Sequence, residues 1–211
     1  MIFIFGLTEY KQDFMKKDII LAGVGGQGIL SIAAIIGTAA VKAGLYLKQA
    51  EVHGMSQRGG DVQSNLRIST DPIASDLIPV GKADLIISVE PMEALRYVPM
   101  LHSDGWIITN TTPFNNIPDY PSSEEILAEI EKQHYHISLD AETIAKEIGS
   151  VKCANVVILG AATPFLGLSY EQIEDAIRSM FGRKGEEIVK MNLSALAAGK
   201  EQAKEQIKLI R

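Results

Sequence analysis

Short runs of apolar residues alternate with helical stretches along the chain, a pattern typical of an α/β domain. A buried strand is predicted at residues 17–23, and the helix predicted after it, at residues 28–43, ends before Gly44. Further strands are predicted at residues 46–52, 62–69, 83–89, 105–110 and 135–139. Helices are predicted at residues 92–101, 122–133, 141–148, 151–166, 169–182 and 185–207.

The second and third predicted strands follow each other through the loop 53–60, with no helix between them. A connection this short joins antiparallel neighbours, because a parallel pair needs a longer crossover. We therefore predict an α/β fold, a three-layer α/β/α sandwich with a Rossmann-like start and a mixed sheet that contains an antiparallel β-hairpin. A single domain is expected over residues 15–211, with residues 1–14 as an N-terminal extension.

A glycine-rich turn separates the first strand from the first helix. Gly23, Gly25 and Gly28 have G-x-G-x-x-G spacing, and Gly26 and Gln27 lie between them. Glycines suit a turn that needs positive φ or a close approach to a ligand. The unpaired N–H groups at the start of the helix suit a phosphate or carboxylate. These five residues are therefore candidate ligand-binding residues, with Gln27 expected to bond a ligand or, more readily, the hairpin loop.

The hairpin loop is longer and chemically richer than a turn requires. Long loops on a rigid sheet tend to carry function. Arg58 suits bidentate contact with a phosphate or carboxylate, and Gly59 and Gly60 would let that ligand approach the backbone. The alternative is that Arg58 pairs with the carboxylate of Glu51 or Asp61.

Composition and charge exclude several kinds of protein. The 211 residues carry a net charge of −6, which argues against nucleic acid as a partner. The single cysteine, Cys153, allows no internal disulfide, thiolate zinc site or iron–sulfur cluster on this chain alone. No apolar run approaches the roughly 20 residues that span a bilayer, and no signal peptide is recognisable. We expect a cytoplasmic protein with no membrane contact and no metal site.

A dinucleotide enzyme is one reading of the glycine turn. Glu51 follows the turn at about the separation of 20 residues expected of a ribose-binding acid. A dinucleotide-binding fold would then need a crossover helix after the second strand. In this chain the loop 53–60 leads to the next strand instead. A stand-alone NAD-dependent oxidoreductase therefore remains an alternative function, beside a non-catalytic binding or assembly module.

Several longer segments are more specific than any glycine pattern. The chain contains GVGGQG after the first strand, EVHGMSQRGG followed by NLRIS, and ADLIISVEPMEALR. Together they resemble the gamma-type domain of the 2-oxoacid:ferredoxin oxidoreductases, in particular the indolepyruvate type. The resemblance covers about residues 15–182. It implies oxidative decarboxylation of a 2-oxoacid, such as indolepyruvate or another aryl pyruvate, to acyl-coenzyme A with ferredoxin as the electron acceptor.

The resemblance also implies that the chain works with a partner. Thiamine diphosphate, Mg²⁺ and the iron–sulfur clusters are expected on a large alpha subunit, because this chain has one cysteine and no thiamine–magnesium motif. Ferredoxin would be reached only indirectly, and coenzyme A would be a co-substrate. The chain alone is expected to hold no cofactor and to be inactive. Met55, at the centre of the hairpin loop, is expected to contact the partner, and the isolated chain to form homodimers through the same patch.

Two further residues are weaker site candidates. His53 would meet the substrate, the thiamine or coenzyme A at the subunit interface, and is the candidate catalytic residue; its alternative role is that of a packed loop residue. Glu90 ends a buried strand at the sheet edge where ligands of open α/β sheets collect. Its alternative role is to cap the helix that follows.

Overall fold

The computed structural model describes residues 14–53, 59–115 and 117–210. The strands of this part are β1 (Lys16–Val24), β2 (Tyr46–His53), β3 (Asp61–Ser69), β4 (Ala83–Ser88), β5 (Leu101–Asn110) and β6 (His136–Leu139). Its α-helices are α1 (Ile29–Lys42), α2 (Pro91–Arg96), α3 (Ser123–Glu131), α4 (Ala141–Ile148), α5 (Ala154–Ala162), α6 (Tyr170–Phe181) and α7 (Glu186–Ile210). The 3₁₀ turns are η1 (Val98–Met100), η2 (Val151–Cys153), η3 (Thr163–Phe165) and η4 (Gly182–Lys184).

The strands form one sheet in the order β2-β3-β1-β4-β5-β6. Strands β1, β4, β5 and β6 pair in parallel, whereas β3 runs antiparallel to both of its neighbours, β1 and β2. Ile20, for example, lies opposite Asn65 of β3 on one side and Ile86 of β4 on the other. The predicted mixed sheet and its antiparallel hairpin are confirmed, because β2 pairs antiparallel with β3, the next strand along the chain.

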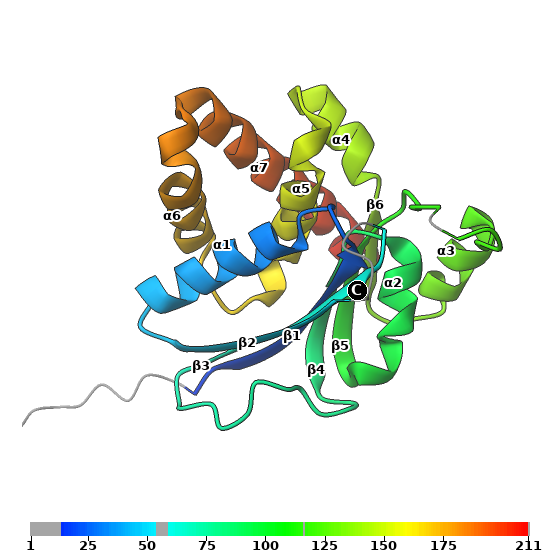
Figure 1. The fold of residues 1–211 in the computed structure, drawn as a ribbon, viewed down its shortest axis with the longest axis horizontal. Helices are drawn as coiled ribbons and strands as arrows, with labels where there is room; N and C mark the ends of the chain where they lie inside the picture. The colour runs from blue at the N-terminus through cyan, green and yellow to red at the C-terminus, as the bar shows by residue number, and fades with distance from the viewer. Residues whose placement is uncertain (1–13, 54–58, 116, 211) are drawn as a thin grey trace, which may run out of the picture.

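Helices cover both faces of the sheet, as the predicted three-layer sandwich requires (Figure 1). Successive residues of a strand point to opposite faces. Ile19 and Leu21 accordingly join the larger apolar cluster, which packs against α1, α4, α5, α6 and α7. Ile20 joins a smaller cluster with Ile86 and with Ala94 of α2. Strand β1 is buried on both faces, and this explains its continuous apolar run.

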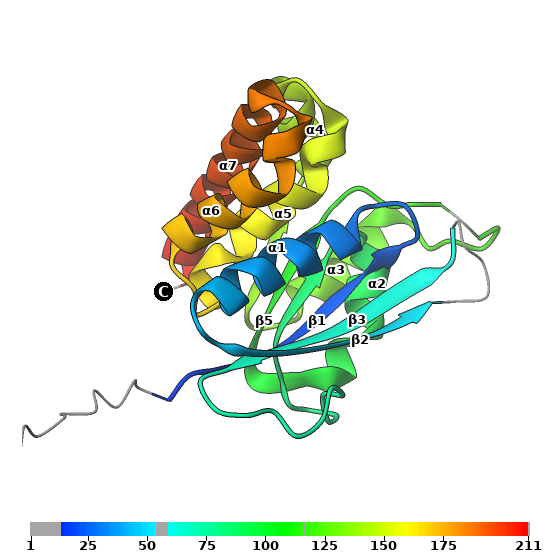
Figure 2. The same cartoon turned by 60° about the vertical axis from the view of Figure 1, so that its left-hand side comes forward.

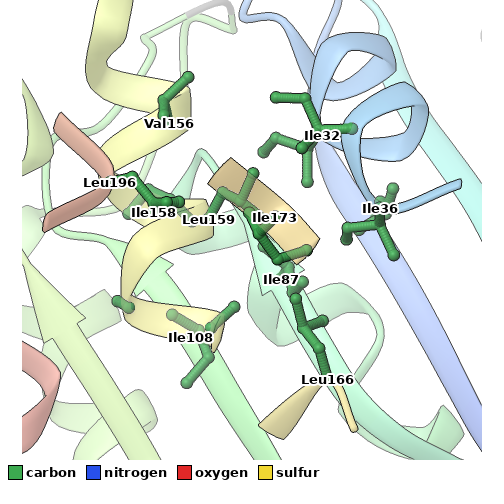
Figure 3. Close-up of a cluster of buried hydrophobic side chains, with 14 of the residues drawn as sticks. Ile32, Ile36, Ile87, Ile108, Val156, Ile158, Leu159, Leu166, Ile173 and Leu196 are labelled. Atoms are coloured by element: carbon green, nitrogen blue, oxygen red, sulfur yellow. The ribbon is translucent and has the colours of Figure 1, made fainter. Parts of the chain in front are cut away.

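The larger cluster holds the helical layer on the sheet. Ile32 and Ile36 of α1 point toward Leu159 of α5 and Ile173 of α6, above Ile87 of β4 (Figure 3). All five side chains are at most 1% exposed. Burying each such side chain contributes roughly 1.5–3 kcal/mol. The glycine turn is therefore anchored by strongly packed elements on both sides, β1 and α1.

Side chains cap the starts of α3, α4 and α6. Ser122 and Glu125 form a capping box at α3, and Ser169 and Gln172 form one at α6. Asp140 caps α4 by accepting a hydrogen bond from the backbone N–H of Thr143. In each of these caps the two residues are three positions apart in the sequence.

The predicted helix at residues 92–101 is wrong in its second half. Helix α2 ends at Arg96, η1 follows, and β5 already begins at Leu101 instead of residue 105. Pro99 accounts for the difference, because it has no N–H for an α-helical hydrogen bond and its ring clashes with the preceding turn.

The last helix, α7, packs closely on α5. Gly160 of α5 and Gly199 of α7 lie so near the opposing backbone that an added Cβ would overlap carbonyl groups of Leu196 and Val157. The two glycines therefore allow the helices to cross. Helix α7 is the longest helix in the described ranges, and neither it nor any other helix there is long and apolar enough to cross a membrane.

Candidate functional site

The glycine turn is closed by its own glutamine. The side-chain Oε1 of Gln27 accepts a hydrogen bond from the backbone N–H of Val24 at 2.8 Å, and the backbone N–H of Gln27 donates to the Val24 carbonyl at 3.1 Å. Gln27 Oε1 is therefore engaged within the turn, whereas residues 54–58 of the hairpin loop lie outside the described part of the chain. This pair of bonds fixes the path of the chain between β1 and α1.

Gly28 allows α1 and α5 to approach each other. It has φ +86° and precedes α1 without a side-chain cap. A Cβ at this position would lie 2.5 Å from Nδ2 of Asn155, which donates a hydrogen bond to the Gly28 carbonyl at 3.0 Å. Gly26 also has a left-handed backbone, with φ +103°. No side chain caps α1, and the N–H groups of Ser31 and Ile32 donate to the Gly28 carbonyl.

The structure brings the two predicted glycine segments together. The backbone N–H of Gly25 donates to the carbonyl of Gly60 at 2.9 Å. The backbone of His53 pairs with Val62 at the end of β2. The side chain of His53, Met55 and Arg58 lie outside the described part of the chain. The roles suggested for these three residues therefore stay predictions.

The buried side chain of Asn110 connects the ends of two parallel strands. Asn110, at the end of β5, is 3% exposed. Its Nδ2 donates to the carbonyl of Val89 at 3.4 Å, and its Oδ1 accepts from the backbone N–H of Ala141 at 3.0 Å. Asn110 thereby ties β4 and β5 to the start of α4. Asn155 of α5 donates to the Gly28 carbonyl, so these bonds hold the ends of β4 and β5, the starts of α4 and α5, and the glycine turn around one space.

That space is a pocket of ≈ 460 Å³ at the carboxyl edge of the parallel strands. The glycine turn and Ser31 line one side, Val89 and Asn110 the floor, and the starts of α4 and α5 the other side. Its charged lining residues in the described ranges are Lys152 and Glu142. The start of α1, which has no side-chain cap, and the ammonium group of Lys152 favour binding of a phosphate or carboxylate.

Glu90 is a structural residue beneath this edge. Its carboxylate is fully buried and accepts hydrogen bonds from the backbone N–H of Glu93 at 2.8 Å and of Phe114 at 3.2 Å, and from the hydroxyl of Tyr120. Burial, followed by the bond to Glu90, raises the pKa of Tyr120. Glu90 thus caps α2 and anchors the loop after β5, so the capping alternative is confirmed.

The described residues do not offer a metal or cluster site. They contain no group of three or more histidine, cysteine or acidic side chains placed to hold a metal ion. Cys153 is buried, and burial raises the pKa of its thiol, which disfavours the thiolate form. The pocket lining in the described ranges contains one carboxylate, Glu142, and no histidine or cysteine side chain.

A comparison with known families identifies the family of this chain. A family model described as pyruvate ferredoxin/flavodoxin oxidoreductase matches residues 18–202. The chain belongs to this family. Its members are oxidoreductases, and this chain is an oxidoreductase subunit.

Relatives match along almost their whole length. A Pyrococcus horikoshii protein named indolepyruvate oxidoreductase subunit IorB is 41% identical, over 92% of this chain and 100% of its own. A protein of the same name from Archaeoglobus fulgidus is 40% identical, over 90% of this chain and 96% of its own. The resemblance stated from the sequence is therefore confirmed.

Solved structures share the fold. The gamma subunit of a keto/oxoacid ferredoxin oxidoreductase from Geobacter sulfurreducens superposes with a TM-score of 0.64 at 25% identity, covering 90% of this chain and 99% of that one. A 2-oxoglutarate:ferredoxin oxidoreductase from Magnetococcus marinus gives a TM-score of 0.74 at 24% identity, covering 90% of this chain and 31% of that one. In the second structure the fold is one part of a much longer chain.

Three pocket residues were not singled out from the sequence. Asn110 is a polar residue at the end of a buried strand, and Asn155 interrupts the apolar stretch 151–166. Both were visible as polar residues at apolar positions, but their partners lie far away in the sequence. Lys152 gives no such signal, because a lysine beside a helix start is ordinary. The glycine residues were found because their spacing is local.

Proposed function

We propose that this chain is the small subunit of an indolepyruvate-type 2-oxoacid:ferredoxin oxidoreductase. The complex would decarboxylate an aryl 2-oxoacid oxidatively to acyl-coenzyme A, releasing carbon dioxide and passing the electrons to ferredoxin. The observation that carries the proposal is the match with the Pyrococcus horikoshii indolepyruvate oxidoreductase subunit, 41% identical over that protein's whole length.

The chemistry is divided between two chains in this proposal. Thiamine diphosphate with Mg²⁺ would supply the nucleophilic carbon and the clusters the electron path, all on a large alpha subunit. Two features of this chain support the division: Cys153 is its single cysteine, and the described residues gather no metal-binding group. A chain of this kind completes an active site without holding a redox cofactor.

This chain would contribute an anion-binding wall to the shared active site. The uncapped start of α1 at Gly28 and the ammonium group of Lys152 face the same pocket. We propose that the glycine turn, Arg58 and the Gly59–Gly60 pair contact a phosphate of coenzyme A or the substrate carboxylate. His53 would approach the same ligand from the end of β2.

Reconstitution tests the proposal directly. Three samples are prepared: this chain alone, the large alpha subunit alone, and the two chains expressed together. Reduction of ferredoxin or a viologen dye is then followed with indolepyruvate and coenzyme A. Activity is expected only from the two chains together. An alpha subunit that is fully active alone, or an isolated small chain that reduces NAD with a 2-oxoacid, would contradict the proposal.

A further inference from the structure

The side-chain amide of Gln27 has one end that is bonded and one end that is free. Its Oε1 accepts the hydrogen bond from the backbone N–H of Val24 at 2.8 Å. Its Nε2 makes no hydrogen bond in the described part of the chain. An amide nitrogen carries two N–H groups and accepts nothing, so this free end can only donate. The glycine turn therefore presents a side-chain donor that the turn itself does not use.

The turn fixes the orientation of this amide. If the amide were rotated by half a turn, Nε2 would face the N–H of Val24, and two donors would meet. The backbone N–H of Gln27 also donates to the Val24 carbonyl at 3.1 Å, so main chain and side chain are both held. Gly23 makes room for the amide, because a Cβ on Gly23 would lie 3.2 Å from Oε1. The Nε2 donor is thus in place before any ligand binds.

Gln27 lies at the wall of the pocket. It lines the pocket together with Gly26 and Gly28, and its side chain is half-buried. Figure 2 shows the turn at the end of β1, between the start of α1 and the start of β3. Because Oε1 is engaged by the backbone of Val24, Nε2 is the end of the amide that remains for a molecule in the pocket.

The other lining residues indicate which acceptor Nε2 meets. The Ser31 hydroxyl lies on the same side of the pocket as Gln27 and can also donate. The two charged lining residues in the described ranges, Lys152 and Glu142, come from the opposite side. The side formed by the glycine turn and α1 therefore has donors and no carboxylate, and it faces an ammonium group across the pocket. Such donors match an anionic oxygen, because hydrogen bonds to a charged acceptor are stronger than neutral ones.

We infer that Gln27 is the residue that recognises the anionic oxygen of the ligand, through a hydrogen bond from Nε2 to a phosphate or carboxylate oxygen. This inference rests on the proposed function and deepens it, because it assigns recognition to one side-chain group of the glycine turn. Closing the turn does not by itself require glutamine, since a glutamate oxygen would accept the bond from Val24 equally well. What glutamine adds is the second end, which donates. A coenzyme A phosphate and the carboxylate of the 2-oxoacid both offer the oxygen that this donor fits.

The substitution Gln27→Glu separates the two ends of the amide. One carboxylate oxygen still accepts the hydrogen bond from Val24, whereas the other replaces the Nε2 donor by a negatively charged acceptor. Gln202→Glu on α7 is the matched control, because Gln202 is an exposed glutamine that does not line the pocket. Each variant is assembled with the alpha subunit, and the KM values for coenzyme A and for indolepyruvate are measured. The melting temperature of each isolated variant is measured beside them.

We expect Gln27→Glu to melt like the wild type and to raise one KM value roughly ten- to a hundredfold, because a hydrogen bond to a charged group is lost. A raised KM for coenzyme A assigns the oxygen to a phosphate, and a raised KM for indolepyruvate assigns it to the substrate carboxylate. Gln202→Glu is expected to leave both KM values and the melting temperature unchanged.

Wild-type KM values for Gln27→Glu would overturn the inference and leave the proposed function standing. A melting temperature well below that of Gln202→Glu would also overturn it, because the amide nitrogen would then serve the fold. Gln27→Met removes both ends of the amide without adding charge, and we expect it to lower the melting temperature and to raise the same KM. A wild-type KM for Gln27→Met would trace the effect of Gln27→Glu to charge alone and overturn the inference. A wild-type complex without activity would instead refute the proposed function.

Discussion

Replacing Gly28 by alanine separates backbone strain from close packing. A left-handed backbone costs an L-residue about 1–2 kcal/mol. The new methyl group would also displace the Asn155 amide, 2.5 Å from its Cβ position, and break the bond from Asn155 to the Gly28 carbonyl. That bond is worth about 0.5–1.5 kcal/mol. Alanine also lowers the conformational entropy of the unfolded chain, which offsets about 0.4–1 kcal/mol of this loss in the free energy of unfolding.

We therefore expect Gly28→Ala to lower the free energy of unfolding by about 2 kcal/mol, or to lower the melting temperature by roughly 4–8 °C for a chain of this size. Gly44→Ala is the control, because Gly44 has φ +76° at the other end of α1 and nothing within 4 Å of its Cβ position. It carries the strain without the collision. Urea denaturation of the isolated chain measures both variants.

A double-mutant cycle decides whether the collision is real. Asn155→Ala removes the side chain that the Gly28→Ala methyl group would strike, and it already loses the hydrogen bond. The double variant should therefore cost less than the sum of the single variants, with a coupling of at least about 0.5 kcal/mol. Additive losses, or equal losses for Gly28→Ala and Gly44→Ala, would refute the reasoning.

Two further predictions concern a binding residue and pH. Arg58→Ala is expected to slow turnover of the reconstituted complex about ten- to a hundredfold without lowering the melting temperature. Arg58→Lys is expected to recover little of this activity. If Arg58→Ala and Asp61→Ala instead both lower the melting temperature, Arg58 is only the structural partner of Asp61. The hydrogen bonds from Thr143 lower the pKa of Asp140 below its ordinary 3.8. The ionised carboxylate therefore stabilises the fold above that pH. This stabilisation is lost as the pH falls through the lowered pKa. The stability gap between wild type and Asp140→Asn, followed by melting from about pH 7 to about pH 2.5, is expected to close in acid, and a constant gap would contradict this.

Local signals explain why most of the fold was predictable. The hairpin followed from a connection too short for a crossover, and the caps at Ser122, Asp140 and Ser169 each involve neighbours along the chain. The incorrect helix end predicted within residues 92–101 also has a local cause, because Pro99 disfavours the helix that the apolar pattern alone predicts. A single residue with fixed backbone geometry outweighed an otherwise helical sequence.

The candidate site was only partly predictable, because its walls come from distant segments. The glycine turn and the Gly59–Gly60 pair were recognisable, but the hydrogen bond between Gly25 and Gly60 depends on the order of the strands. Asn110 and Asn155 needed partners from β4, α4 and the glycine turn before their roles could be assigned. Sequence spacing predicts an element; it does not predict which elements share an edge.

The position of β3 gives the dinucleotide-like turn different surroundings from those in a dinucleotide fold. In a dinucleotide fold, the strand that carries the ribose-binding acid lies next to the strand before the turn. Here β3 lies between β1 and β2, so the backbone of Glu51 is two strand spacings, about 9–10 Å, from β1. The inserted strand also brings Gly60 to the N–H of Gly25, which a phosphate would otherwise use. The turn thus joins α1 to the start of β3, while Gly26, Gln27 and Gly28 line the pocket on its other side.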